Sequence, residues 1–140
     1  MFSTAERAYL ETARVGRLAT ADEGGRPNVV PFCFALHDGT LVSAIDEKPQ
    51  QGDPASLRRA RDVRENPYVA AVVDEYSEDW SELRWVQVRG RAALVDPGDD
   101  EHGAGIAALR EKYDQYRNHA IEDRPLLRIR PGHVLSWGLD

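Results

Sequence analysis

The chain has 140 residues and a formal net charge of −6, from 24 acidic against 18 basic residues. This length predicts one domain, residues 1–140, and a composition of 41% hydrophobic and 30% charged residues is typical of a soluble globular protein. The acidic balance argues against nucleic-acid binding, which needs a basic face to neutralise phosphates. The sequence has no apolar run of the roughly 20 residues that would span a membrane, and MFSTAERAYLE lacks the apolar core of a signal peptide. We therefore expect a cytoplasmic protein that is not bound to membranes.

The first part of the sequence predicts a short helix followed by three strands. Ser3 and Glu6 have the spacing of a capping box at the start of the helix. Pro31 interrupts the second strand and predicts a bulge or an unpaired position, because proline cannot donate a hydrogen bond to a ladder. His37-Asp38-Gly39 is typical of a tight hairpin. The expected elements are a helix to about residue 13 and strands at 15–20, 27–36 and 40–46.

The second part predicts two further helices and three strands. Gly90 lies in the middle of a long strand and predicts a bend or bulge of the kind that curls a sheet. On this strand Val86, Val88, Ala92 and Leu94 share one face, and Trp85, Gln87, Arg89 and Arg91 share the other. The expected elements are helices at 54–65 and 101–117 and strands at 68–75, 83–95 and 126–137, the last divided by Pro131-Gly132. On the second of these helices Ile106, Leu109, Tyr113 and Tyr116 form an apolar stripe.

This order of elements predicts a mainly β protein of the α+β kind. Three strands in succession, joined by tight turns, favour an antiparallel sheet. We expect a small barrel of about six mostly antiparallel strands with the helices packed outside it.

The sequence lacks the motifs of several common enzyme classes. It contains no GxGxxG, no Walker A loop and no GxSxG elbow. Its four histidines have no metal-binding spacing, so no metal site is expected. Cys33, the single cysteine, lies between two phenylalanines and is expected to be a buried, inert thiol.

A binding site is predicted where the strand at 40–46 leads into the helix at 54–65. A planar ligand could lie against the two strands joined by the hairpin, with its phosphate near Lys48 and Arg58. The alternative is that Lys48 is a solvated loop residue and that Arg58 pairs with Asp62 across one helical turn. Trp85, on the polar face of its strand, either covers a partner subunit or stacks on a ligand.

The sequence resembles the pyridoxamine 5'-phosphate oxidase-like proteins, whose fold is the FMN-binding type of split β-barrel. Within them it is similar to the small deazaflavin-dependent oxidoreductases of actinobacteria. The resemblance covers most of residues 5–95 and is carried by VGRLATADEGGRPNVVPFCF, LVSAIDEKP, RRARDVRENPYVAAVVDEY and DWSELRWVQVRGRAALV. A weaker similarity surrounds Lys112-Tyr113 and Tyr116-Arg117.

The resemblance implies a homodimer with two cofactor sites between the subunits. The implied cofactor is coenzyme F-420, a deazaflavin, with FMN as the alternative. Lys48 matches the phosphate-binding residue and Arg58 matches less well; relatives with further basic residues after this lysine contrast with Gln50 and Gln51 here. By position the remaining cofactor-binding residues are Val30, Pro31, Phe32, Ser43, Ala44, Ile45 and Asp46, with Trp85 as aromatic cover.

Three hypotheses about function stay open at this point. The first is a deazaflavin-dependent reductase of a small unsaturated or quinone-like molecule, in which the cofactor supplies the hydride and no catalytic acid or base is needed. The second is an FMN-dependent oxidoreductase of the same fold. The third is a non-catalytic protein that binds the cofactor or another small ligand.

Overall fold

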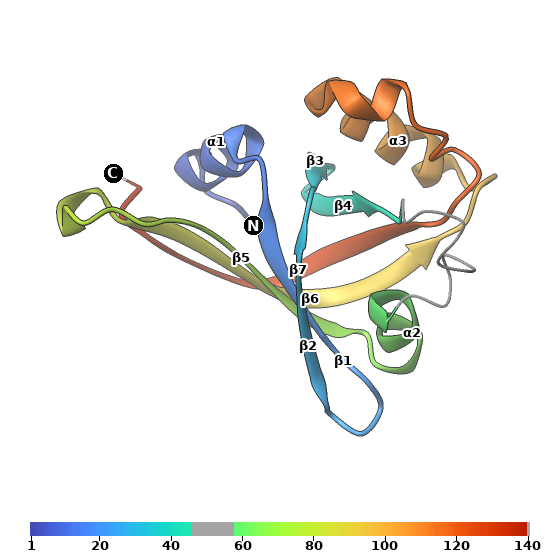
Figure 1. Ribbon diagram of the computed structural model, residues 1–140, viewed down its shortest axis with the longest axis horizontal. Helices are drawn as coiled ribbons and strands as arrows, with labels where there is room; N and C mark the ends of the chain where they lie inside the picture. Colours follow the sequence, from blue (N-terminus) through green and yellow to red (C-terminus); the bar gives the residue numbers. More distant parts are fainter. Residues whose placement is uncertain (46–57, 140) are drawn as a thin grey trace.

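The computed structural model describes residues 1–45 and 58–139 (Figure 1), and in these residues the strands form one sheet. The sheet has seven strands in the order β2-β1-β5-β6-β7-β4-β3, and the pairs are antiparallel. The strands are β1 (Gly16–Ala21), β2 (Pro27–Phe32), β3 (Ala35–His37), β4 (Thr40–Ala44), β5 (Tyr68–Glu75), β6 (Arg84–Val95) and β7 (Leu126–Trp137). The helices are α1 (Thr4–Thr12), α2 (Arg58–Glu65) and α3 (Asp100–Lys112), with short 3-10 turns η3 (Trp80–Glu82) and η4 (Asp114–Arg117).

The two edge strands of the sheet, β2 and β3, are neighbours in the chain. Only Cys33 and Phe34 separate them, so the curled sheet brings its own edges together without a ladder between them. This confirms the predicted split barrel. The prediction of about six strands was low by one, because the expected strand at 27–36 is two strands with a break at these two residues.

Pro31 lies within β2 and causes no bulge there. It pairs with Arg17 in an unbroken register that runs from Ala21↔Pro27 to Gly16↔Phe32. Since β2 is an edge strand, the missing N–H of proline costs no ladder bond if it points outward. The hairpin between β3 and β4 is as predicted: Asp38 and Gly39 both have positive φ, at 50° and 73°, which suits a type I′ turn.

The long strand β6 alternates between the interior and the surface as its sequence predicts. Val86 and Val88 are fully buried, whereas Arg89 and Arg91 are exposed. The pairing of β6 with β7 shifts between Arg89 and Gly90, which confirms the predicted bulge. The expected division of the last strand at Pro131-Gly132 is this same bulge, and β7 continues through it.

The helices lie outside the sheet. The capping box of α1 is present, with the Ser3 Oγ accepting from the Glu6 N–H and a Glu6 carboxylate oxygen accepting from the Ser3 N–H. α3 packs over β3 and β4, and α2 contacts β1 and β6 (Figure 1). The predicted helix at 101–117 ends at Lys112 and continues as η4, but its apolar stripe is buried as expected. The start of the predicted helix at 54–65 lies outside the described residues.

Two buried clusters form the core. The larger fills the barrel and includes Leu10, Leu18, Phe34 and Val86. The smaller lies under α3 and includes Ile106, Leu109, Tyr113, Tyr116 and Leu126. No helix in the described part of the chain is long and apolar enough to cross a membrane.

Candidate functional site

A cavity of about 210 Å³ opens where the two edges of the sheet meet. The end of β2 and the break that follows it form one wall, and the end of β4 forms another. η4 and the first turn of α2 complete it. The lining residues are Val15, Pro31, Phe32, Cys33, Ser43, Ala44, Arg59 and Tyr116.

Four of the predicted site residues line this cavity. Pro31 and Phe32 come from β2, and Ser43 and Ala44 come from β4. The prediction that these two strands lie beside one ligand is therefore consistent with the geometry. Two other predicted residues adjoin the lining positions in sequence: Val30 is half-buried opposite Leu18, and Ile45 is buried directly after β4.

Lys48, which was predicted to bind the phosphate, and Asp46, which was predicted to lie beside the cofactor with Ser43, Ala44 and Ile45, both lie outside the described residues. Arg58 is described and points elsewhere. It lies with Asp22, Arg26 and Asp62 around a separate polar cavity of about 470 Å³. Its Nε lies 2.9 Å from the carboxylate of Asp62, which is the ion pair that the alternative interpretation expected.

Arg59, the next residue along α2, lines the cavity where the two edges of the sheet meet, which we call the seam cavity. Its guanidinium is the cation that the described chain brings to this cavity. No feature of the sequence favoured Arg59 over Arg58, because the predicted phosphate site identified the helix but not the direction of each side chain.

Cys33 is half-buried and belongs to the cavity wall, which corrects the expectation of a fully buried thiol. It forms no disulfide. Tyr116 was predicted to lie on the apolar stripe of the helix at 101–117. It is 93% buried, yet it also lines the cavity. No sequence pattern predicts that Cys33 and Tyr116 line a cavity rather than lie in the core.

Side chains hold the backbone of the break between β2 and β3. Ser43 Oγ donates to the carbonyl oxygen of Cys33 at 2.7 Å, and the Phe34 N–H donates to the hydroxyl of Tyr113 at 3.2 Å. Lys112 Nζ donates to the carbonyl oxygen of Phe34 at 2.9 Å and to that of Leu10 at 3.0 Å. These bonds satisfy backbone groups that no neighbouring strand pairs with.

Burial shifts the titration of two of these groups. Removal from water, together with the nearby Arg14 cation, lowers the pKa of Lys112 to about 8. Burial also raises the pKa of Tyr113, so its hydroxyl stays protonated at neutral pH. The ammonium of Lys112 lies 4.0 Å from the ring centroid of Phe34, which compensates part of its lost hydration.

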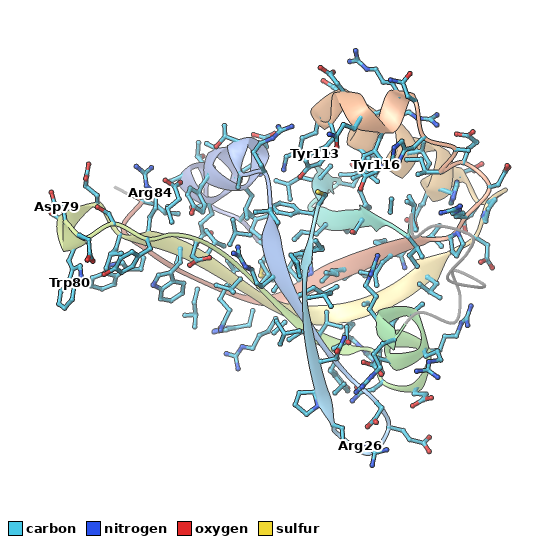
Figure 2. All side chains as sticks on the ribbon, in the orientation of Figure 1. Arg26, Asp79, Trp80, Arg84, Tyr113 and Tyr116 are labelled. Carbon is cyan, nitrogen blue, oxygen red and sulfur yellow. The ribbon has the colours of Figure 1, made fainter. Side chains whose placement is uncertain are left out.

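Trp85 lies away from the cavity, on an arm formed by β5, β6 and β7. It is half-buried between Asp74 of β5 and Trp137 of β7. Figure 2 shows Trp80 at the end of this arm, opposite Tyr113 and Tyr116. The arm carries a group of exposed large apolar side chains, which we call the arm patch: Tyr76, Trp80, Leu135 and Trp137.

The cavity is suited to binding more than to acid–base chemistry. Its lining in the described residues is largely apolar and aromatic, with the hydroxyl-bearing residues Ser43 and Tyr116, a thiol and a guanidinium but no carboxylate or imidazole. No group of three His, Cys, Asp or Glu residues in the described ranges is arranged to hold a metal ion. A reaction at this cavity therefore needs a bound group to supply the chemistry.

A curled antiparallel sheet whose edges meet at a cavity is the architecture of a split β-barrel protein. The chain belongs to the pyridoxamine 5'-phosphate oxidase family, whose sequence model matches residues 2–138.

Among its relatives is a 5a,11a-dehydrotetracycline/5a,11a-dehydrooxytetracycline reductase of Streptomyces rimosus. It is 28% identical over 140 residues, which cover 99% of this chain and 84% of that protein. A FAD-binding protein of Mesorhizobium loti has a TM-score of 0.65 at 27% identity, covering 96% of this chain and 94% of the other. A heme-binding protein of Mycobacterium smegmatis shares the fold, with a TM-score of 0.74 at 22% identity; the match covers 99% of this chain and 55% of the other.

Proposed function

We propose that the protein is an oxidoreductase that uses coenzyme F-420 to transfer a hydride to a small unsaturated or quinone-like substrate. The cavity at the seam carries this proposal, because Pro31, Phe32, Ser43 and Ala44 line it and the family resemblance assigns these positions to the cofactor. The Streptomyces reductase, at 28% identity, supports reductive chemistry.

The lining fits a flat aromatic ring system. Phe32 and Ala44 offer apolar surface from two different strands, and Ser43 and Cys33 offer small polar atoms at the ring edge. Within the part of the chain that the structure describes, the outer edge of β2 has no neighbouring strand, so its backbone groups could bind the edge of a planar ligand. The volume of about 210 Å³ is below the usual range of roughly 300–1,000 Å³ for ligand pockets. The cofactor would therefore extend beyond this cavity, and a partner subunit would cover its exposed part.

Arg59 supports an anionic ligand at one end of the cavity. Its guanidinium can donate two parallel hydrogen bonds to a phosphate. Lys48 remains the second candidate for this role from the sequence. Arg58 is the weaker candidate, since it already pairs with the buried carboxylate of Asp62.

The chain's own contribution to the reaction would be to bind and orient. When bound, a reduced deazaflavin supplies a hydride to an electron-poor carbon. The apolar walls would exclude water from the ring face, and the held backbone at Cys33 and Phe34 would fix the wall against which the ring lies. Because the described part of the lining contains no carboxylate or imidazole, the proton that the product needs in addition to the hydride would come from solvent.

FMN is the alternative cofactor. The observation that favours it is the FAD-binding protein of Mesorhizobium loti, which has this fold and is 27% identical. A flavin presents a similar flat ring and a phosphate, so the same cavity and the same Arg59 serve both proposals.

Binding titrations with the two cofactors test these proposals. We expect the purified protein to quench the fluorescence of coenzyme F-420. We also expect it to catalyse the oxidation of the reduced cofactor by a quinone or an unsaturated ketone. Binding of FMN alone would favour the alternative, and tight binding without turnover of any such substrate would favour a carrier. If neither cofactor binds, both oxidoreductase proposals fail.

Two arginines of one helix give a matched pair of variants for the same assay. Arg59→Ala should weaken cofactor binding about tenfold to a hundredfold, the range for a lost charge-assisted hydrogen bond. Arg61→Ala removes the same charge from α2 but at the separate polar cavity, so its affinity should match that of the wild type. Equal losses in both variants would indicate only a general effect of charge.

We also propose that two copies of the chain pair through the arm patch. Trp80 and Trp137 are 73% and 62% exposed, and isolated monomers rarely leave such large aromatic side chains together in water. Trp85 faces the same side of the sheet as Trp137, its cross-strand neighbour, so the apolar surface continues towards the barrel. A second copy of this surface is the occupant that the family resemblance implies.

A further inference from the structure

Lys112 stands out among the described residues as a half-buried cation with no carboxylate bonded to it. Lys112 Nζ donates to two backbone carbonyl oxygens: that of Leu10, in the last turn of α1, and that of Phe34, between β2 and β3. It is also one of only two lysines in a chain whose other basic residues are arginine. Removing an ammonium ion from water, even in part, is costly unless it is paired and hydrogen-bonded, so the location of Lys112 requires an explanation.

Tyr113 acts on the same backbone segment. Its hydroxyl accepts from the Phe34 N–H, and it has acceptors at the carbonyl oxygens of Arg14 and Phe34, at 2.9 and 3.0 Å. Two consecutive residues at the end of α3 therefore bind both polar groups of the Phe34 backbone. The side chain of Phe34 is fully buried, so this residue has no freedom to shift by rotating outward.

We propose that Lys112 and Tyr113 are positioning residues of the cofactor site: by holding Phe34 they fix the Cys33 wall of the seam cavity at the spacing that the cofactor needs. This inference rests on the proposed function and adds to it a pair of residues that do not line the seam cavity. Lys112 instead lines a second cavity, of about 410 Å³, on the other side of the break with Glu11 and Arg14.

The position of the wall depends on these bonds because no strand holds the break. Cys33 lies one residue from Phe34 and is tied to β4 by the 2.7 Å bond from Ser43. When the bonds to Phe34 are lost, the break between β2 and β3 is held by the bond from Ser43 to Cys33 and by the buried ring of Phe34. The backbone of Cys33 is then less restrained relative to Ser43 and Ala44, and the preformed geometry of this wall of the cavity is weakened.

The charge of Lys112 makes this position depend on pH. The groups facing it are Arg14 and Glu11 from the end of α1, Glu111 and Tyr113 from α3, and Cys33 from the break. Above pH 8 the ammonium loses its proton, and its bonds to the two carbonyl oxygens weaken from charge-assisted to neutral. Cofactor affinity should therefore fall as the pH rises through about 8.

Global stability should respond to the same titration in the opposite direction. The pKa of Lys112 is about 8 in the folded chain and 10.5 in the unfolded reference, so the unfolded chain holds more protons between these values. The contribution of Lys112 to the free energy of unfolding consequently increases with pH across this window. If unfolding caused the loss of affinity above pH 8, the free energy of unfolding would fall over the same pH range. Measuring both quantities therefore separates the two effects.

Cys33 provides a readout that needs no cofactor. It is the only cysteine in the sequence and lines the cavity, so the rate at which a thiol reagent such as dithionitrobenzoate modifies it reports the state of the wall. We would compare wild type, Lys112→Met and Lys112→Arg, measuring this rate and the dissociation constants for coenzyme F-420 and FMN from about pH 6.5 to about pH 9.5. Thiol ionisation itself affects all three proteins, whereas Lys112→Arg keeps a cation that does not titrate in this range.

We expect Lys112→Met to react several-fold faster at Cys33 and to bind cofactor at least about tenfold more weakly than wild type at pH 7. Lys112→Arg should restore most of both properties and remove the fall in affinity above pH 8. A folded Lys112→Met protein with wild-type thiol rate and affinity would overturn the proposal, as would a pH profile that is unchanged in Lys112→Arg. If Lys112→Met does not fold, Tyr113→Phe and the wild-type pH profile give the decision by the same criteria. If no cofactor binds even the wild type, the proposed function fails while the thiol rates still test the positioning role.

Discussion

The Nε of Arg58 lies 2.9 Å from a carboxylate oxygen of Asp62, and the side chain of Asp62 is only 2% exposed. Thr20 Oγ1 donates to the same carboxylate at 2.7 Å. Arg58 also donates to the carbonyl oxygen of Arg26, and thereby joins α2 to the turn between β1 and β2. A buried charge with this set of partners is a structural centre, whatever else its arginine binds.

Replacing Arg58 by alanine should therefore destabilise the fold. Asp62 would remain buried with one hydroxyl donor and no cation, at a cost of about 2–3 kcal/mol in the free energy of unfolding. Urea denaturation at pH 7 measures this cost. The double variant Arg58→Ala, Asp62→Asn should recover part of it, because an amide does not need the cation. A single variant as stable as wild type would show that the pair contributes little.

Gly90 allows the two long strands to cross closely at the bulge. A Cβ atom at this position would lie 2.1 Å from the carbonyl oxygen of Arg130, which is backbone and cannot move aside alone. Gly90→Ala should cost about 2–3 kcal/mol. Gly132→Ala is the matched control, since its Cβ would lie 3.6 Å from the Arg89 carbonyl oxygen, an ordinary contact. Equal thermal unfolding temperatures in the two variants would contradict this account of the bulge.

Much of the fold could be predicted because local signals and tertiary contacts agree. The capping box at Ser3, the alternation along β6 and the glycine at its bulge each depend on residues close in sequence. The break at Cys33 and Phe34 could not be predicted in this way. Its backbone is satisfied by Tyr113 and Lys112, about 80 residues away, and no local pattern announces such bonds.

The candidate site was predicted at the level of strands more than of side chains. Pro31, Phe32, Ser43 and Ala44 line one cavity, but the prediction that their strands are neighbours across the hairpin was wrong: β4 pairs with β3 and β7, and the curl of the sheet brings the end of β2 to the same cavity. The exchange of Arg58 for Arg59 shows the limit. One residue corresponds to about 100° around a helix, so a small error in the helix direction sends a different side chain to the cavity.

Glu6 connects α1 to the end of β7 and should make part of the stability depend on pH. The Ser136 hydroxyl, which donates to Glu6 at 2.6 Å, lowers the pKa of Glu6 most, and the Ser3 N–H lowers it further. A lowered folded pKa gives stability that is present above the unfolded value of 4.5 and is lost as the pH falls through the folded value. The wild type should therefore unfold at a higher temperature than Glu6→Gln at pH 6, and this difference should shrink below pH 4.5. A constant difference across that range would exclude the ionised Glu6 as its source.

The role that the sequence predicts for Lys48 is to bind the phosphate of the cofactor. If its ammonium binds the phosphate, Lys48→Ala should weaken cofactor binding by about 1.5–3 kcal/mol while leaving stability unchanged. Isothermal titration with coenzyme F-420 and with FMN measures this loss. Unchanged affinity would remove Lys48 from the site and leave the phosphate to Arg59.

A charge in the arm patch should separate the proposed dimer. In a symmetric pair each substitution occurs twice across the interface, so Trp137→Arg places two cations on apolar surface. The dissociation constant of the dimer should rise by at least about tenfold, which sedimentation velocity over a range of concentrations can measure. Gln115→Arg adds the same charge on η4, away from the arm, and should leave the dimer intact. Because a partner subunit would cover the cofactor, Trp137→Arg should also bind cofactor more weakly as the protein is diluted. A dimer of wild-type strength in this variant would place the interface elsewhere on the molecule.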